Sequence, residues 1–174
     1  LKEKYQCEII ASEYDKDRVP GIDRTVHEGD VIKLGNHNAI IYETPGHTIG
    51  HIIYFFEKQN LLFVGDTLFA LGCGRLFEGT AEQMYHSLAK IKLLPDDSLV
   101  HCAHEYTEAN AHFALSLEQN NDALNQRYEE IKKLRKQNQA TVPFQLGKDK
   151  QTNPFLLAQN INEFAERRKR KDNF

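Results

Sequence analysis

One short apolar run constrains the fold of this chain more than any other feature of its sequence. Residues 61–64, Leu-Leu-Phe-Val, are uninterrupted large hydrophobic residues, and the run stops at Gly65-Asp66. This pattern predicts a β-strand that is buried on both faces and that ends with a polar side chain at the rim of the sheet. We therefore expect a sheet that is covered on both sides at this strand.

Segments around this run carry the signals of further strands and of one helix. Short runs rich in β-branched and aromatic residues lie at 31–34, 39–42, 52–56 and 99–102. In residues 80–93 the apolar Met84, Leu88 and Ile91 recur with helical spacing, and Thr80 is the expected N-cap. The strand–helix–strand order predicts a layered α/β fold rather than a helical bundle.

The second part of the chain has a different character. After residue 106 the β-branched clusters disappear, and helical spacing with many charged residues follows. The predicted segments are helices at 108–117, 122–137 and 162–170, a loop at 139–152, and a turn at 153–155 that leads into a short helix. We therefore expect two domains, residues 1–106 and residues 107–174.

Composition and charge exclude several classes of partner. The 174 residues carry a formal net charge of -3, and positive and negative side chains are intermixed. Such a chain has no strong electrostatic field of one sign that would attract nucleic acid or a membrane. No apolar run approaches the roughly 18 to 20 residues that span a bilayer. Cys7, Cys73 and Cys102 form no CxxC pair, which suits a reducing compartment. We expect a cytoplasmic monomer and, because residue 1 is Leu rather than Met, a chain truncated at its N-terminus.

Three polar residues stand just past the ends of predicted strands, and their shared placement is informative. They are His47, Asp66 and His104. In open α/β layers, ligand sites lie at strand ends, where loops can aim side chains without disrupting the core. Imidazole and carboxylate together form a ligand set that suits zinc, iron or manganese. The pattern predicts a metal site.

Each of these residues also has a simpler interpretation. A single His or Asp at a strand end is more often a turn former or a surface group. The tight turns before His47 and Asp66, made by Pro45-Gly46 and Gly65, favour the metal interpretation, and His51 is expected to orient a ligand rather than to be one. The remaining histidines lack such a context and are expected to be solvated or packed: His27, His37, His86, His101 and His112.

Several longer motifs carry a specific resemblance. They are Thr44-Pro45-Gly46-His47-Thr48, Gly65-Asp66-Thr67-Leu68-Phe69, Gly72-Cys73-Gly74-Arg75-Leu76-Phe77-Glu78-Gly79-Thr80, His104-Glu105-Tyr106-Thr107, Asn153-Pro154-Phe155 and the basic tail at 167–174. In this order they resemble the motifs of the glyoxalase II (hydroxyacylglutathione hydrolase) family of the metallo-β-lactamase superfamily, over nearly the whole chain. The resemblance implies a four-layer αββα metallo-β-lactamase sandwich, present in part, with a C-terminal α-helical domain.

The resemblance also implies roles for the polar residues. His47 would bind one of two divalent metal ions, Asp66 would bridge both, and His104 would bind the second, with zinc expected and iron or manganese as alternatives. A metal-bound hydroxide would be the nucleophile. The family's HxHxDH motif does not occur in this sequence, so the chain alone is expected to bind metal weakly and to be a poor catalyst.

The implied substrate is a glutathione thioester, S-(2-hydroxyacyl)glutathione such as S-lactoylglutathione. A metal-dependent thioesterase of this family would hydrolyse it to glutathione and a 2-hydroxy acid, D-lactate, in methylglyoxal detoxification. Its carboxylates call for cations and donors in the pocket. By resemblance the substrate contacts would be Arg75, Phe77, Tyr106, Arg168 and Lys171, with Phe77 standing where some members have a tyrosine.

Two other functions stay open at this point. One is an iron enzyme similar to the glutathione persulfide dioxygenases of the same superfamily, which share a Gly-Cys-Gly-Arg loop. Its loop continues differently from Leu76-Phe77-Glu78-Gly79, which favours the hydrolase. The other is a non-catalytic module that keeps only the glutathione-binding half. The basic tail could also be an ordinary solvated helix face.

Overall fold

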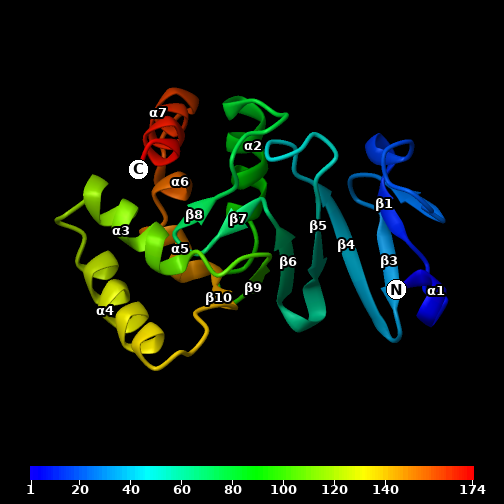
Figure 1. The fold of residues 1–174 in the computed structure, drawn as a ribbon, viewed down its shortest axis with the longest axis horizontal. Helices are drawn as coiled ribbons and strands as arrows, with labels where there is room; N and C mark the ends of the chain where they lie inside the picture. Colours follow the sequence, from blue (N-terminus) through cyan, green and yellow to red (C-terminus); the bar gives the residue numbers. More distant parts are fainter.

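The computed structural model describes residues 1–174 and is built around a six-stranded mixed sheet (Figure 1). The strand order is β10-β9-β6-β5-β4-β3. The strands are β3 (Val31–Leu34), β4 (His37–Glu43), β5 (Ile52–Phe56), β6 (Leu61–Gly65), β9 (Leu99–Cys102) and β10 (Phe144–Gln145). All neighbouring pairs are antiparallel except β6 and β9, which are parallel. The strands predicted at 31–34, 39–42, 52–56, 61–64 and 99–102 are therefore confirmed.

The parallel pair depends on the predicted helix. Parallel neighbours need a crossover connection, and α2 (Ala81–Lys92) supplies it between β6 and β9. The helix begins with a complete capping box, in which Thr80 and Gln83 exchange side-chain and backbone hydrogen bonds. The predicted apolar residues Met84, Leu88 and Ile91 are all buried. They join the main core, which lies between the sheet and the helices.

Two two-stranded sheets and the remaining helices complete the structure. Strands β1 (Ile10–Ser12) and β2 (Arg24–Val26) pair in parallel, and β7 (Leu68–Phe69) and β8 (Gly72–Cys73) form a hairpin. The helices are α1 (Lys2–Tyr5), α3 (Thr107–Leu117), α4 (Asp122–Lys136), α5 (Leu146–Thr152), α6 (Pro154–Leu157) and α7 (Ile161–Asp172), with short 3-10 turns at Glu13–Asp15 and Glu57–Gln59. None of these helices combines the length and the apolar character that crossing a bilayer requires.

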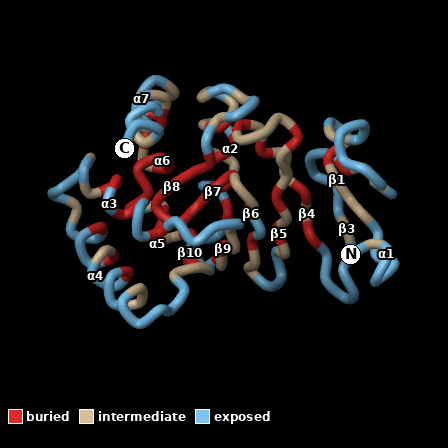
Figure 2. The backbone as a smooth tube through the Cα atoms, in the orientation of Figure 1, coloured by how far each residue is buried: buried red, intermediate tan, exposed pale blue.

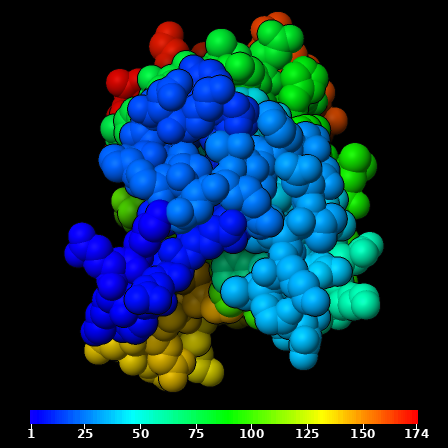
Figure 3. Space-filling view, turned by 90° about the vertical axis from the view of Figure 1, so that its right-hand side faces the viewer, coloured from blue at the N-terminus to red at the C-terminus, as the bar shows by residue number.

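Burial is uneven along the long axis of the molecule. Figure 2 shows the buried backbone gathered at β7, β8 and α6, whereas α1 and β3 at the N-terminal end are mostly exposed. The surface at that end is formed by the N-terminal residues, drawn blue to cyan in Figure 3. The best-packed part of the protein is therefore the junction between the large sheet and the C-terminal helices.

The prediction that residues 61–64 are buried on both faces is wrong. Side chains alternate along β6: Leu62 and Val64 are fully buried, but Phe63 is 40% exposed. The register places Phe63 on the same face as Tyr54 and His101, opposite the main core. On that face its ring stacks on His101 at a centroid distance of 4.8 Å. An apolar run alone did not distinguish this half-buried strand from a fully buried one.

The prediction of a loop at 139–152 is also wrong in its second half. Residues 144–145 form β10 at the edge of the sheet, and α5 follows directly at residue 146. Pro143 and Gly147 favour a loop locally, but Phe144 and Leu146 are both buried in the main core. Tertiary burial therefore outweighs the local signals here.

Candidate active site

A cleft of about 480 Å³ lies between the ends of the central strands and the C-terminal helices. Its lining includes all eight side chains that the sequence suggests as metal ligands or substrate contacts: His47, Asp66, Arg75, Phe77, His104, Tyr106, Arg168 and Lys171. These residues span 125 positions of sequence, from residue 47 to residue 171. The fold brings them together because β6 and β9 are parallel neighbours whose carboxyl ends meet at one edge of the sheet.

Asp66 and His104 are in direct contact at this edge. Asp66 follows β6, His104 follows β9, and Nε2 of His104 lies 3.1 Å from Oδ1 of Asp66. The ring of Tyr106 stacks on the His104 ring with a centroid distance of 4.7 Å and an interplanar angle of 12°. The pair is therefore held from one side by an aromatic ring and is open to the cleft on the other.

His47 has a defined proton arrangement. Its Nδ1 lies 2.9 Å from the carbonyl oxygen of Arg75, and a carbonyl can only accept, so Nδ1 carries the proton. In the neutral ring Nε2 then carries the lone pair, which is the form of a histidine that binds metal through Nε2. Gly74 packs against the His47 ring and the backbone of Asp66: a Cβ at this position would lie 2.0 Å from the Asp66 carbonyl oxygen and 3.1 Å from Nδ1 of His47. Only glycine permits this approach.

His51 contacts the backbone of Asp66. The Asp66 N–H donates to Nε2 of His51 at 3.1 Å, and Nδ1 lies 3.2 Å and 3.0 Å from the hydroxyl oxygens of Thr44 and Thr67. Burial lowers the pKa of His51, which favours the neutral ring that these contacts require. Gly65 has a φ of 50° and would push a Cβ to 2.8 Å from Nε2. The glycine before Asp66 thus permits the turn that sets this contact.

The opposite wall of the cleft carries the cations. Nζ of Lys171 donates to the Ala109 carbonyl at 3.2 Å, and burial, with Arg168 and Arg75 nearby, lowers the pKa of Lys171 to about 8. The side chain of Arg75 is largely exposed, with Nε 3.6 Å from Asp172. Both cations keep further N–H donors beyond these contacts, and with them can bind carboxylates of a small molecule.

Arg168 differs from the other two cations because it is buried. Its NH1 donates to the Cys73 carbonyl at 2.8 Å, and its NH2 lies 2.9 Å from Asp172. Its guanidinium also lies over the ring of Phe155 at 5.0 Å. The structure therefore places Arg168 at the base of the cleft, where it holds the backbone of the Gly-Cys-Gly-Arg loop.

The donor set fits a divalent metal in type. His47 with a free Nε2 and the Asp66–His104 pair are nitrogen and carboxylate donors of the kind that zinc, iron and manganese bind. No group of three or more His, Cys, Asp or Glu side chains is drawn together tightly enough to hold an ion by itself. In donor type, these side chains match part of a metal shell.

The sequence interpretation missed one polar residue of the cleft, Asn110. It lies on α3, is buried, and donates from Nδ2 to the Ala70 carbonyl at 3.1 Å. In the sequence it appears only as one residue of a helical segment. A signal was present, because a polar residue flanked by Ala109 and Ala111 interrupts the apolar face of that helix.

Comparisons with known proteins identify the family. Residues 4–104 match the model of the metallo-beta-lactamase superfamily, and residues 105–174 match the model of the hydroxyacylglutathione hydrolase C-terminus. The hydroxyacylglutathione hydrolase of Rhizobium etli is 49% identical and that of Chelativorans sp. 47%, each over an alignment 188 positions long, gaps included. The alignments cover 100% of this chain and 73% and 74% of those relatives.

A solved structure supports the fold. ETHE1 from Myxococcus xanthus is 23% identical, with a TM-score of 0.69, over 97% of this chain and 60% of that one. The mixed sheet with its C-terminal helices is thus the α/β metallo-β-lactamase fold followed by a helical region, and the family implies binding of divalent metal. The resemblance seen in the sequence is confirmed: the chain belongs to the hydroxyacylglutathione hydrolase family of the metallo-beta-lactamase superfamily.

Proposed function

We propose that the protein hydrolyses the thioester bond of S-(2-hydroxyacyl)glutathiones such as S-lactoylglutathione, releasing glutathione and a 2-hydroxy acid such as D-lactate. One observation carries the proposal: a single cleft has metal-type donors on one wall and cations on the other. A glutathione thioester needs both, because its carbonyl must be activated while its carboxylates are held. The relatives described above bear the name of this activity.

We infer that His47, Asp66 and His104 supply part of the ligand shell of two divalent metal ions, zinc in the first instance, with iron or manganese as alternatives. When bound, such ions polarise a carbonyl and lower the pKa of water. The chain's own contribution is orientation. The Arg75 carbonyl keeps the Nδ1 proton on His47, and His51 fixes the backbone of Asp66. Asp66 is the residue whose loss should most affect catalysis.

The cation wall would bind the glutathione moiety. Arg75 and Lys171 can pair with its carboxylates, and Tyr106 can offer its hydroxyl, while Phe77 supplies an exposed apolar ring next to His47. Arg168 would act through the loop backbone, because its NH1 and NH2 are already engaged. On this proposal residues 107–174 form the substrate-binding domain, whose C-terminal helix α7 carries two of these cations.

We place the reaction in the cytoplasm. All three cysteines, Cys7, Cys73 and Cys102, are free thiols, as in proteins of a reducing compartment. Neither Cys73 nor Cys102 is suited to be a nucleophile, since burial raises the pKa of both thiols, that of Cys73 to about 11. The chemistry of the cleft therefore does not depend on cysteine.

The test is S-lactoylglutathione hydrolysis by residues 1–174 and by a version extended with whatever coding sequence its gene holds upstream, each with its metal content determined. We expect turnover with about two metal ions per protein in the extended version. Absence of turnover in a metal-loaded extended protein would contradict the proposal. Oxygen uptake with glutathione persulfide would then indicate the dioxygenase, and binding of glutathione without either reaction would indicate the non-catalytic module.

A further inference from the structure

The turn between β7 and β8 connects the two walls of the cleft. Asp66 lies just before β7, and Arg75 lies just after β8. Phe69 and Gly72 are paired across the hairpin, so only Ala70 and Leu71 form its tip. The conformation of this short turn therefore determines how far the donor residue Asp66 lies from the substrate cation Arg75.

Side chains from the C-terminal helices bind the backbone of this turn. Nδ2 of Asn153 donates to the carbonyl oxygens of Phe69 and Gly72, at 3.2 Å and 3.0 Å. Nδ2 of Asn110 donates to the carbonyl oxygen of Ala70 at 3.1 Å. Three of the four carbonyl groups of residues 69–72, which in an exposed hairpin turn would face water, are thus bonded by two buried amides.

The remaining polar groups of the turn are held in the same way. The Leu71 N–H lies 3.3 Å from both carboxylate oxygens of Asp149, and Arg168 donates to the carbonyl of Cys73, the next residue. Every residue from 69 to 73 is therefore bonded by a side chain of the C-terminal helices or their caps. Any movement of the turn relative to those helices would break these bonds.

Leu71 adds an apolar anchor to these bonds. It has a φ of 60°, a conformation that costs energy for any residue with a Cβ, and it is fully buried. Its side chain belongs to a small core whose other buried members all come from α3 and α4: Ala111, Ala114, Leu124 and Ile131. A strained backbone persists only where its surroundings fix it, and here they fix both the side chain and the peptide.

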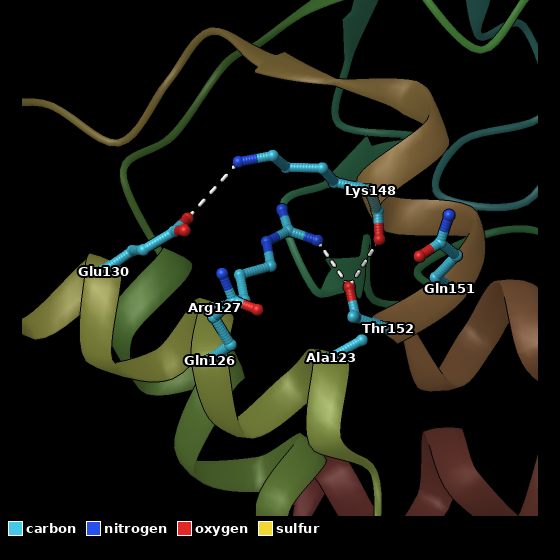
Figure 4. A pocket seen from close by; sticks show the side chains of 7 residues that line it. All are labelled: Ala123, Gln126, Arg127, Glu130, Lys148, Gln151 and Thr152. Atoms are coloured by element: carbon cyan, nitrogen blue, oxygen red, sulfur yellow. Dashed lines mark hydrogen bonds and ion pairs between the residues drawn. The ribbon is translucent and has the colours of Figure 1, made fainter.

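Asp149 is itself fixed from a second helix. It is 0% exposed, and its Oδ1 lies 2.6 Å from NH2 of Arg127, which reaches across from α4. Figure 4 shows the same guanidinium donating to the hydroxyl of Thr152, and Lys148 paired with Glu130, among the residues that line a small surface pocket. The carboxylate also accepts a hydrogen bond from Nδ2 of Asn153 at 2.7 Å. The bonds to the turn thus belong to one connected buried network.

We propose that Asn110, Asp149 and Asn153 form a clamp of positioning residues, which fixes the 69–72 turn and so sets the placement of Asp66 relative to Arg75. Its kinetic consequence rests on the proposed hydrolase function. A clamp of this kind acts on both walls of the cleft at once, so loosening it should alter both substrate binding and turnover. A purely structural network would affect only the fraction of folded protein.

A matched pair of variants separates these two roles. Asn153 and Asn160 are both helix N-caps, accepting hydrogen bonds from Phe155 N–H at 2.9 Å and from Glu163 N–H at 3.0 Å. Serine caps a helix as well as asparagine does, so Asn153→Ser and Asn160→Ser should both retain their caps. Only Asn153→Ser also removes the three amide bonds of the clamp.

The experiment uses the full-length, metal-loaded enzyme well below its unfolding temperature. Asn153→Ser should raise KM and lower kcat, reducing kcat/KM by about tenfold to a hundredfold, the usual result of misplacing reacting groups by about an ångström. Asn160→Ser should leave both constants within about twofold, as expected for a surface cap whose acceptor is kept. Wild-type kcat and KM in folded Asn153→Ser would overturn the clamp as a positioning device.

A second measurement tests, without relying on activity, whether the clamp fixes the turn. Hydrogen exchange of the Leu71 amide, followed without substrate, should be slow in the wild type and faster in Asn153→Ser. Unchanged exchange would overturn the clamp even if the variant were inactive.

If the wild type shows no thioesterase activity, the proposed function fails, while exchange at Leu71 still tests the clamp. Should Asn153→Ser not fold, Asn110→Ala removes a single clamp bond, and it should shift exchange and KM in the same direction by less.

Discussion

The cleft has two ends that are built by different means. The donor end, His47, Asp66 and His104, stands on loops after strands, and its Asp66 and His104 side chains are 29% and 46% exposed. The clamped end, the 69–72 turn with its partners on the helices, is almost entirely withdrawn from water. The comparison suggests a division of labour. The chemistry resides where side chains remain accessible, and the rigidity that aims them resides in the buried network.

The largest effect on activity is expected at the donor end. Asp66→Ala in the full-length protein should reduce hydrolysis to the uncatalysed background, because the proposed bridging carboxylate is lost. The unfolding free energy should change by less than about 1 kcal/mol, since this side chain lies outside the hydrophobic core and its one partner, His104, is itself about half exposed. Activity and urea denaturation measured on the same preparation test both statements. Wild-type-like turnover in this variant would remove Asp66 from its assigned role.

The clamped end should respond in the opposite way, with a large loss of stability. Asp149→Asn leaves the buried Arg127 without a counter-charge, which typically costs about 3–5 kcal/mol. Urea denaturation of the chain gives this value directly. The double variant Arg127→Met, Asp149→Asn should recover much of the loss, because it no longer buries an unpaired charge. A loss below about 1 kcal/mol in the single variant would show that this end is less tightly built than its contacts indicate.

The two ends also differ in how far the sequence revealed them. His47, Asp66 and His104 were recognisable because local turn residues precede two of them and because strand ends are predictable. The clamp was not, because its bonds join residues that are distant in the chain: Asp149 and Leu71 are 78 positions apart. Asp149 moreover lay within a segment predicted as a loop. Side-chain bonds to a distant backbone leave no periodic pattern in the sequence.

The same distinction explains the successes and errors in the fold. The five predicted strands and α2 have local signals, namely short apolar runs and a helix cap, and they were predicted correctly. The edge strand β10 depends on pairing with β9, more than 40 residues earlier, and was missed. The exposure of Phe63 depends on what covers one face of β6, which its own four-residue run does not encode. Non-local burial is the common cause of these errors.

The pH dependence of KM should report on the cations of the cleft, in particular Lys171, rather than on the donor end. The pKa of Lys171 lies at about 8 because burial, followed by the charges of Arg168 and Arg75, disfavours its ammonium form. As pH rises through this value the charge is lost, so the proposed contact with a substrate carboxylate weakens. Between pH 7 and pH 9 the charged fraction falls about tenfold, and KM should rise by up to about that factor.

The control for this prediction is Lys171→Arg, because arginine stays protonated over the whole range. Its KM should remain flat from pH 7 to pH 9, whatever its absolute value. Steady-state measurements need correction for spontaneous thioester hydrolysis at each pH. A wild-type KM that does not change across this range would show that Lys171 does not pair with the substrate in its charged form.

The smallest effect is expected from Thr80→Ala, which tests whether the donor end depends on α2. The capping box lies next to the turn that carries His47, since the Gly79 N–H donates to the Gly46 carbonyl at 3.1 Å. Losing the cap should cost about 1 kcal/mol and lower Tm by about 2–4 °C. If the clamped end aims the catalytic groups, kcat/KM should stay within about twofold of the wild type, and Thr80→Ser should restore Tm. A drop in kcat/KM at a temperature where the variant is fully folded would mean that the donor end is also positioned from α2, and that rigidity is shared between both ends of the cleft.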